Sequence, residues 1–153
     1  MRPEERDELI ERYHRGFQAV SEALDRVGPQ RIDSAVDGEW SPRQVVHHLA
    51  DAALFHAIRL RLLLAEDEPR LQAYDERRFA SSLAYERPIA SSLALLASVM
   101  DSNLELLAEL DEDDWSRTGM HEELGSFSVE DWLQNASRHA HEDADQILKA
   151  VAI

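Results

Sequence analysis

Residues 128–153 read SVEDWLQNASRHAHEDADQILKAVAI, and this stretch decides the fold. Its apolar residues recur every three or four positions, which is the spacing of one helix face. They are Val129, Trp132, Leu133, Ala136, Ala140, Ala144, Ile147 and Val151. A step of about 100° per residue places Asp143 near the middle of this apolar face and His139 on its flank. Because burying an unpaired carboxylate is costly, the sequence predicts a cation or a hydrogen-bond donor facing Asp143.

The same periodicity predicts two helices in the first half of the chain. One runs from about Pro3 to Val27, and Gly28-Pro29 ends it. The other begins at Ser41, where Ser41 and Gln44 can form a capping box, and it continues to about Leu64. Residues 30–40 between them are expected to form an irregular connection.

A third helix is predicted from about Pro88 to Leu110, and long connections flank it on both sides. Residues 65–88 form a charged link in which Asp75 to Ala80 is expected to be a short helix. Residues 111–127 cross over to the last helix, with glycines as turn residues. No stretch alternates well enough between apolar and polar residues to predict a strand.

Four long helices in 153 residues predict one all-α domain over residues 1–153, a four-helix bundle with long crossover connections. Ser128, with Asp131 three residues later, is expected to cap the last helix. Binding sites in such bundles usually lie between facing helices.

Composition excludes several classes of partner. The formal charge of −15 opposes nucleic-acid binding, which depends on Lys and Arg neutralising phosphates. No apolar run reaches the ~18 residues of a membrane span, and the charged N-terminus is unlike a targeting signal. The chain has no cysteine, and therefore no disulfide or thiolate chemistry. We expect a cytoplasmic protein with a small-molecule substrate.

His139 and Asp143 are four residues apart, so both can reach one ion from the same helix face. Imidazole and carboxylate are donors for zinc, nickel, iron and manganese. From spacing alone, a salt bridge between Asp143 and a buried arginine such as Arg59 is an equal alternative.

The second predicted helix supplies further histidines. His48 lies on the edge of its apolar face and is the better candidate ligand, whereas His47 points nearly opposite. His56 lies near the centre of that face. It is a candidate fourth ligand, a candidate partner of a ligand, or a hydrogen-bonded histidine of the core. We expect His47, along with His14 and His141, to be surface residues.

Several motifs, in order, resemble those of the DinB-like metalloproteins, especially the YfiT-like branch. They are GEWSPRQVVHHLAD at 38–51, AIRLRL at 57–62, YDERRF at 74–79, SLALL at 92–96 and HEELG at 121–125. The resemblance covers roughly residues 40–147. It implies a four-helix bundle, often a homodimer, that holds one divalent metal through three histidines.

The resemblance assigns two of these ligands to His48 and His139, while Asp143 stands where the family has its third histidine. Two histidines and a carboxylate form a known open metal site, with one unit less positive charge than three histidines. Zinc or nickel is the expected metal, with manganese or iron as alternatives. The resemblance also makes His121 and residues 74–79 candidate pocket or dimer contacts, or anchors of the long links.

Related enzymes of this superfamily transfer low-molecular-weight thiols such as bacillithiol or mycothiol, and the metal holds the thiolate. The resemblance therefore implies a thiol-dependent S-transferase acting on a small electrophile, in which the metal lowers the pKa of the thiol. A metal-dependent hydrolase, in which the ion activates water, is one alternative. A non-catalytic metal-binding or small-molecule-binding bundle with a degenerate site is the other, and Asp143 favours it.

Overall fold

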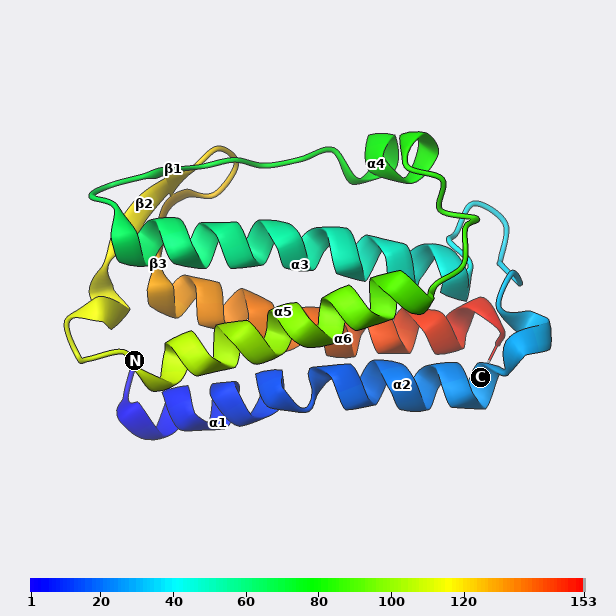
Figure 1. The fold of residues 1–153 in the computed structure, drawn as a ribbon, viewed down its shortest axis with the longest axis horizontal. Helices are drawn as coiled ribbons and strands as arrows, with labels where there is room; N and C mark the ends of the chain where they lie inside the picture. Colours follow the sequence, from blue (N-terminus) through cyan, green and yellow to red (C-terminus); the bar gives the residue numbers. More distant parts are fainter. Residues whose placement is uncertain (153) are drawn as a thin grey trace.

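The computed structural model describes residues 1–152, in which four long helical segments form a bundle (Figure 1). The first segment consists of α1 and α2, and the other three are single helices. Their bounds are α1 Pro3–His14, α2 Gly16–Val27, α3 Pro42–Ala65, α5 Ala90–Ala108 and α6 Val129–Ala150. The predicted four-helix-bundle fold is confirmed, with each long helix where the apolar periodicity places it.

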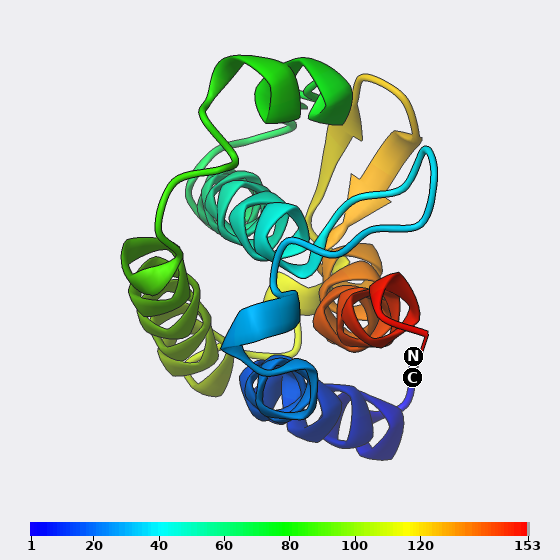
Figure 2. The same cartoon turned by 90° about the vertical axis from the view of Figure 1, so that its right-hand side faces the viewer.

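The order of the helices around the bundle differs from simple up-and-down packing. α6 lies between α3 and the α1–α2 segment, and α5 lies opposite α6 between the same two neighbours (Figure 2). The first and second helical segments of the chain therefore occupy opposite corners. This order requires the long connections before and after α5 that the sequence predicts.

The first helical segment is broken, which corrects the prediction of one helix from Pro3 to Val27. α1 ends at His14, and Arg15 lies outside both helices. Gly16 is buried against α6, and a Cβ on it would lie 2.9 Å from the Cβ of Ala140. Only glycine allows this close approach of α2 to α6, and glycine also weakens a helix interior.

A small three-stranded sheet lies at one end of the bundle, where no strand was predicted. Its strands are β1 Arg70–Leu71, β2 Thr118–His121 and β3 Gly125–Ser128. β1 is parallel to β2, with Arg70 opposite Met120, and β2 and β3 form an antiparallel hairpin. Strands of two to four residues are too short to show alternation in the sequence. The sheet joins the two long connections.

The helix starts follow the predicted capping chemistry. Ser41 Oγ accepts a hydrogen bond from the Gln44 backbone N–H at 3.2 Å, and the Gln44 side chain accepts one from Ser41 N–H. Ser128 and Asp131 form the same box at the start of α6. The predicted short helix is α4 (Glu76–Ser82), capped by Asp75. Turns of 3₁₀ helix, η1 (Pro29–Arg31) and η2 (Asp114–Ser116), lie in the other connections.

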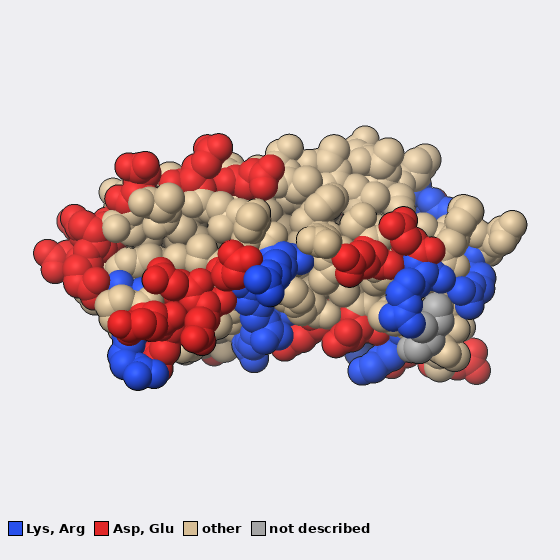
Figure 3. Space-filling model, turned by 90° about the horizontal axis from the view of Figure 1, so that it is seen from below, with Lys and Arg blue, Asp and Glu red and all other residues tan. Residues whose placement is uncertain are grey.

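The bundle interior is apolar, and most charged side chains lie outside it. Viewed from the side of α1 and α2, acidic groups intermingle with basic ones over much of the surface (Figure 3). Within residues 1–152, none of the helices combines the length and hydropathy of a membrane span. Trp132 at the start of α6 is fully buried, and its indole N–H donates to the His56 carbonyl of α3 at 2.7 Å. This bond fixes α6 against α3, the two helices that carry the candidate site.

Candidate metal centre

Asp143 is buried in the middle of the apolar face of α6, as its position in the helical repeat predicts. The residue is 8% exposed, and its Oδ2 is buried without a hydrogen-bond partner among residues 1–152. An ionised carboxylate left in this state is strongly destabilising. The structure therefore shows the buried acid that the sequence predicts, with no hydrogen-bond donor of residues 1–152 bonded to its Oδ2.

Two imidazole rings face this orphaned oxygen. His48 Nε2 of α3 lies 3.5 Å from Asp143 Oδ2, and His139 Nε2 of α6 lies 3.6 Å from it. One donor atom from each of the three residues lies within 4.8 Å of the others. The structure thus brings together the three residues that were the predicted ligands.

The spacing of these atoms fits a shared metal ion better than direct hydrogen bonds. A nitrogen-to-oxygen hydrogen bond is 2.7–3.2 Å long, so both contacts to Asp143 are too long. Two donors bound tetrahedrally to zinc at about 2.0–2.2 Å lie about 3.3–3.6 Å apart. The three residues therefore fit a divalent ion by donor type and by the unsatisfied carboxylate, and both distances from the histidines to Asp143 match two donors on one zinc ion.

Burial keeps both histidines in the form that binds metals. It lowers the pKa of His48 to about 4, against the opposing charge of Asp51. Burial, together with the neighbouring His48, also lowers the pKa of His139 to about 4. At neutral pH both rings are uncharged and have a free lone pair, which metal binding requires.

In the absence of metal, burial disfavours the ionised form of Asp143, which is the form that binds a metal. Burial, together with the charges of Glu76 and Glu142, raises the pKa of Asp143 to about 7. Near neutral pH this carboxylate is therefore only partly ionised in the absence of a cation. A bound divalent ion favours the ionised form.

Aromatic packing orients the His48 ring. The Trp40 ring, just before α3, lies 4.9 Å from it between centroids, and the His139 ring lies 5.3 Å away on the other helix. Trp40 also contacts Tyr85, whose hydroxyl donates to Asp51 Oδ2 at 2.6 Å. The connection before α3 and the link after α4 thus help to hold the His48 ring in position.

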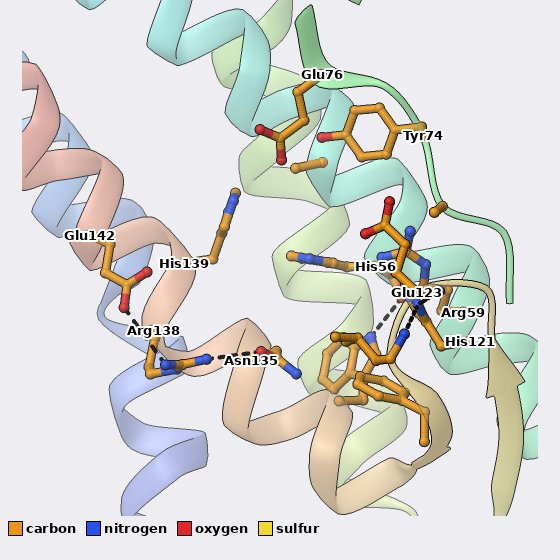
Figure 4. Close-up of a pocket in the computed structure, with 15 residues that line it drawn as sticks. His56, Arg59, Tyr74, Glu76, His121, Glu123, Asn135, Arg138, His139 and Glu142 are labelled. Atoms are coloured by element: carbon orange, nitrogen blue, oxygen red, sulfur yellow. Dashed lines mark hydrogen bonds and ion pairs between the residues drawn. The ribbon is translucent and has the colours of Figure 1, made fainter.

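A cavity of about 230 Å³ opens beside His139 (Figure 4). α3, α6, the link around Tyr74 and the β2–β3 hairpin line it. Its polar and charged lining residues are His56, Arg59, Tyr74, Glu76, His121, Glu123, Asn135, Arg138, His139 and Glu142. A small molecule in this cavity would therefore contact a candidate metal ligand directly.

Two alternatives for the site are not supported by the geometry. Arg59 donates both Nε and Nη2 to the Gln72 carbonyl and forms no salt bridge with Asp143. His56 does not join the three converging donors. Its ring packs edge-on against the His139 ring, with centroids 5.2 Å apart. His56 therefore contacts a candidate ligand and lines the cavity.

His47 corrects a prediction, because it is fully buried and not a surface residue. One ring nitrogen lies 2.7 Å from Ser92 Oγ and the other lies 2.9 Å from the Arg87 carbonyl oxygen. The start of α5 and the link before it cover this face of α3, a contact that the helical repeat of α3 alone does not show. His14 is exposed as predicted, and His141 is partly exposed with its Nε2 bonded to the Arg12 carbonyl.

Residues of the two long connections also reach the cavity. His121 of β2 is 6% exposed, Tyr74 reaches the cavity from the link before α4, and Glu76 reaches it from the first residue of α4. Position in the chain gave no hint that these segments, nearly fifty residues apart, meet; the pairing of β1 with β2 brings them together. The resemblance was the signal that singled them out.

Comparison with known proteins agrees with this geometry. A sequence model of the DinB superfamily matches residues 4–147. A protein named "Putative metal-dependent hydrolase" from Oceanobacillus iheyensis is 40% identical over 106 residues, covering 69% of this chain and 62% of that protein. One with the same name from Halalkalibacterium halodurans is 30% identical, covering 75% and 67%. The chain thus spans less than two thirds of the first relative's length.

Among solved structures, YfiT from Bacillus subtilis superposes on this chain with a TM-score of 0.90 and 27% sequence identity. The match covers 98% of this chain and 87% of YfiT. YfiT is described as a probable metal-dependent hydrolase with an unusual four-helix bundle topology. These matches confirm the resemblance that the sequence motifs indicate.

Proposed function

Because this chain belongs to the DinB superfamily, we propose that it is a divalent-metal-dependent enzyme, and specifically a low-molecular-weight-thiol S-transferase. The substrate is a small electrophile, and the cosubstrate is a thiol of the bacillithiol or mycothiol type. His48, His139 and Asp143 are the proposed ligands, and zinc or nickel is the proposed metal, with manganese or iron as alternatives.

One observation carries this proposal: two neutral imidazoles and an orphaned buried carboxylate converge beside a cavity of small-molecule size. Three protein ligands leave a coordination position open, as catalytic sites require. A divalent ion held there would lower the pKa of a bound thiol or water and so provide a nucleophile at neutral pH.

Asp143 favours the thiol over water. A carboxylate in place of a third histidine lowers the net charge of the site by one unit, which weakens its ability to polarise a bound group. A thiol has a pKa of about 8.5, so it needs little help to ionise. Water starts at about 15.7 and needs a much larger shift. A site of reduced charge can therefore ionise a bound thiol more readily than a bound water molecule.

A metal-dependent hydrolase is the second candidate, and the names of the relatives favour it. The cavity also carries carboxylates beside His139, from Glu76 and Glu142. Activation of water requires a nearby proton acceptor, and either residue could fill that role.

An activity assay separates these candidates. Protein loaded with zinc or nickel is incubated with bacillithiol and 1-chloro-2,4-dinitrobenzene, and the products are followed by mass spectrometry. A transferase forms the carbon–sulfur bond as chloride leaves, and the thiol proton passes to the buffer. A hydrolase forms dinitrophenol without thiol. Absence of both products contradicts the proposal for this pair of substrates.

Matched variants tie the activity to the site. His139→Ala is expected to abolish the reaction. His141→Ala, two residues along α6 and bonded to the Arg12 carbonyl, should retain it. Equal activity of these variants would show that the reaction takes place elsewhere. If the protein binds no metal, the non-catalytic bundle is the better account.

A further inference from the structure

Arg59 is a half-buried cation in the cavity that no carboxylate of residues 1–152 neutralises through a salt bridge. Its Nε and Nη2 both donate to the Gln72 carbonyl, at 3.1 and 2.6 Å. Its guanidinium carbon lies 5.6 Å from the centroid of the Phe55 ring. These contacts fix the guanidinium group and leave Nη1 without a protein partner within the described chain.

Arg138, which lines the same cavity, differs from Arg59 because an acidic side chain lies within salt-bridge distance of its charge. Its Nη1 lies 4.0 Å from the Glu142 carboxylate, and its Nη2 donates to Asn135 Oδ1 at 2.9 Å. Arg138 is also more than half exposed to solvent. Among residues 1–152, Arg59 forms no salt bridge with a carboxylate, although the charges of Glu122 and Glu123 act on it from the β2–β3 hairpin. It is also less exposed than Arg138, and its free Nη1 is available to a ligand.

His121 adds a neutral donor beside Arg59. Its Nδ1 accepts hydrogen bonds from the backbone N–H groups of Glu123 and Leu124, at 3.1 and 3.2 Å. An accepting Nδ1 carries no proton, so the proton of the neutral ring lies on Nε2. Burial and the charge of Arg59 lower the pKa of His121, which keeps the ring neutral. Nε2 is thus a hydrogen-bond donor with no protein acceptor among residues 1–152.

Tyr74 supplies a third polar group without a partner. Its ring stacks on the Phe55 ring, with centroids 4.2 Å apart and planes 8° apart. Its hydroxyl is buried, lines the cavity and has no hydrogen-bond partner in residues 1–152. Unsatisfied buried polar groups are rare in folded proteins. This buried hydroxyl lies in the same cavity lining as the free Nη1 of Arg59 and the free Nε2 of His121, and together the three groups indicate a polar ligand.

The distance from the metal centre sets the length of that ligand. Arg59 lies eleven residues after His48 on α3, or about 16 Å along the helix at about 1.5 Å per residue. The route to His139 is shorter: the His56 ring lies 5.2 Å from the His139 ring, and His56 and Arg59 are three residues apart on one face of α3, so the guanidinium and His139 are separated by roughly 10 Å. In Figure 4, Arg59 and His121 lie across the cavity from His139.

We propose that Arg59 and His121 form a carboxylate-binding subsite, so that the substrate or thiol is a small acid. Its carboxylate lies at Arg59 while its reacting group lies beside His139. The placement of the reacting group rests on the proposed function, but the carboxylate subsite does not. A singly charged carboxylate fits better than a doubly charged phosphate, because Glu76, Glu123 and Glu142 line the same cavity.

A pair of probes that differ only in charge tests the subsite. The zinc-loaded protein is titrated by calorimetry with 6-mercaptohexanoate and with 6-mercaptohexan-1-ol. The acid should bind about 10-fold or more tightly, because a hydrogen bond between a guanidinium and a carboxylate is roughly twice as strong as one between neutral groups. Equal affinity for the two probes overturns the proposal.

Variants then assign the preference to Arg59. Arg59→Met should bind both probes equally, whereas Arg138→Met should keep the preference for the acid. A merely structural role of Arg59 would weaken both probes by the same factor, and that result overturns the proposal, as does a preference retained by Arg59→Met. If Arg59→Met fails to fold, Arg59→Lys replaces it. A lysine cannot bond Gln72 and present a free N–H to the ligand in the same planar geometry, so the preference should fall, and an unchanged preference contradicts the subsite.

A metal-free arm separates this proposal from the proposed function. Hexanoate and hexan-1-ol are titrated into protein treated with chelator. An Arg59-dependent preference for hexanoate supports the subsite even where zinc fails to bind and the thiol group adds no affinity. No preference in this arm, with zinc binding intact, leaves the metal site standing and overturns the subsite.

Discussion

At the scale of single residues, Asp143 explains most of the site. Its Oδ2 is buried without a hydrogen-bond partner in the described part of the chain, and it lies 3.5 and 3.6 Å from two imidazole nitrogens. Without a cation, this arrangement disfavours the ionised carboxylate and leaves the two rings with nothing to bind. One divalent ion would satisfy all three groups, so we interpret the three as a metal site and not as structural polar residues.

The raised pKa of Asp143 makes metal-free stability depend on pH. The folded-state pKa is about 7 against 3.8 for the free group, so between these values the folded protein binds more protons than the unfolded chain. Its free energy of unfolding therefore falls as pH rises through this window. The lowered pKa values of His48 and His139 have the opposite effect between about pH 4 and pH 6.5, where they make the free energy of unfolding rise with pH.

Asp143→Asn isolates this effect, because asparagine cannot ionise. In the presence of chelator, the free energy of unfolding of the variant minus that of the wild type should be roughly 2 kcal/mol larger at pH 8 than at pH 5. Urea unfolding of both proteins at the two pH values measures the gain. A difference that does not change with pH would show that Asp143 ionises as it does in water.

His121 and His56 are expected to be dispensable for metal binding, since neither belongs to the three converging donors. His121→Ala and His56→Ala should each retain one metal ion per chain, measured by inductively coupled plasma mass spectrometry. Loss of metal from His121→Ala would place this residue in the metal site and would contradict its role as a hydrogen-bond donor.

At the scale of helices and strands, the α2–α6 contact positions one ligand. Gly16 lies against Ala140, the residue after His139, and a Cβ at Gly16 would lie 2.9 Å from the Ala140 Cβ. A larger side chain would push the two helices apart and would displace the backbone of His139 from its position in the site. The close contact of α2 and α6 is thus linked to the geometry of the site.

Gly16→Val should therefore destabilise the protein by about 2 kcal/mol and weaken metal binding. Gln18→Val places the same side chain on an exposed position of α2, and should cost less than about 1 kcal/mol. Urea unfolding and zinc titration measure both effects. Equal behaviour of the two variants would show that α2 tolerates displacement from α6.

The helices were predictable because caps and apolar periodicity are local signals, as at Ser41 and Ser128. The break at Gly16 was missed because it depends on how closely two helices approach, which the sequence of one helix does not show. The burial of His47 was missed for the same reason, since another helix covers it. Asp143 was predictable because a charge on an apolar face contradicts the local pattern.

At the scale of the whole molecule, the homodimer implied by the family resemblance stays a prediction. Leu54 and Ile58 lie one turn apart on the outer face of α3 and are 42% and 57% exposed, so we propose them as part of the contact. Light scattering should give twice the chain mass of 17.4 kDa, and Leu54→Glu with Ile58→Glu should give the monomer. A monomeric wild type would contradict the dimer.

The central claim, a divalent ion held between α3 and α6, is tested most directly by metal analysis of protein purified without chelator. We expect one zinc or nickel ion per chain. Chelator should lower the melting temperature by roughly 5–10 °C, since a ligand at 100-fold its dissociation constant adds about 2.7 kcal/mol. Asp143→Ala should lack the ion, and His47→Ala should keep it if it folds. A wild type without stoichiometric metal, and unaffected by zinc, nickel or manganese, would contradict the claim.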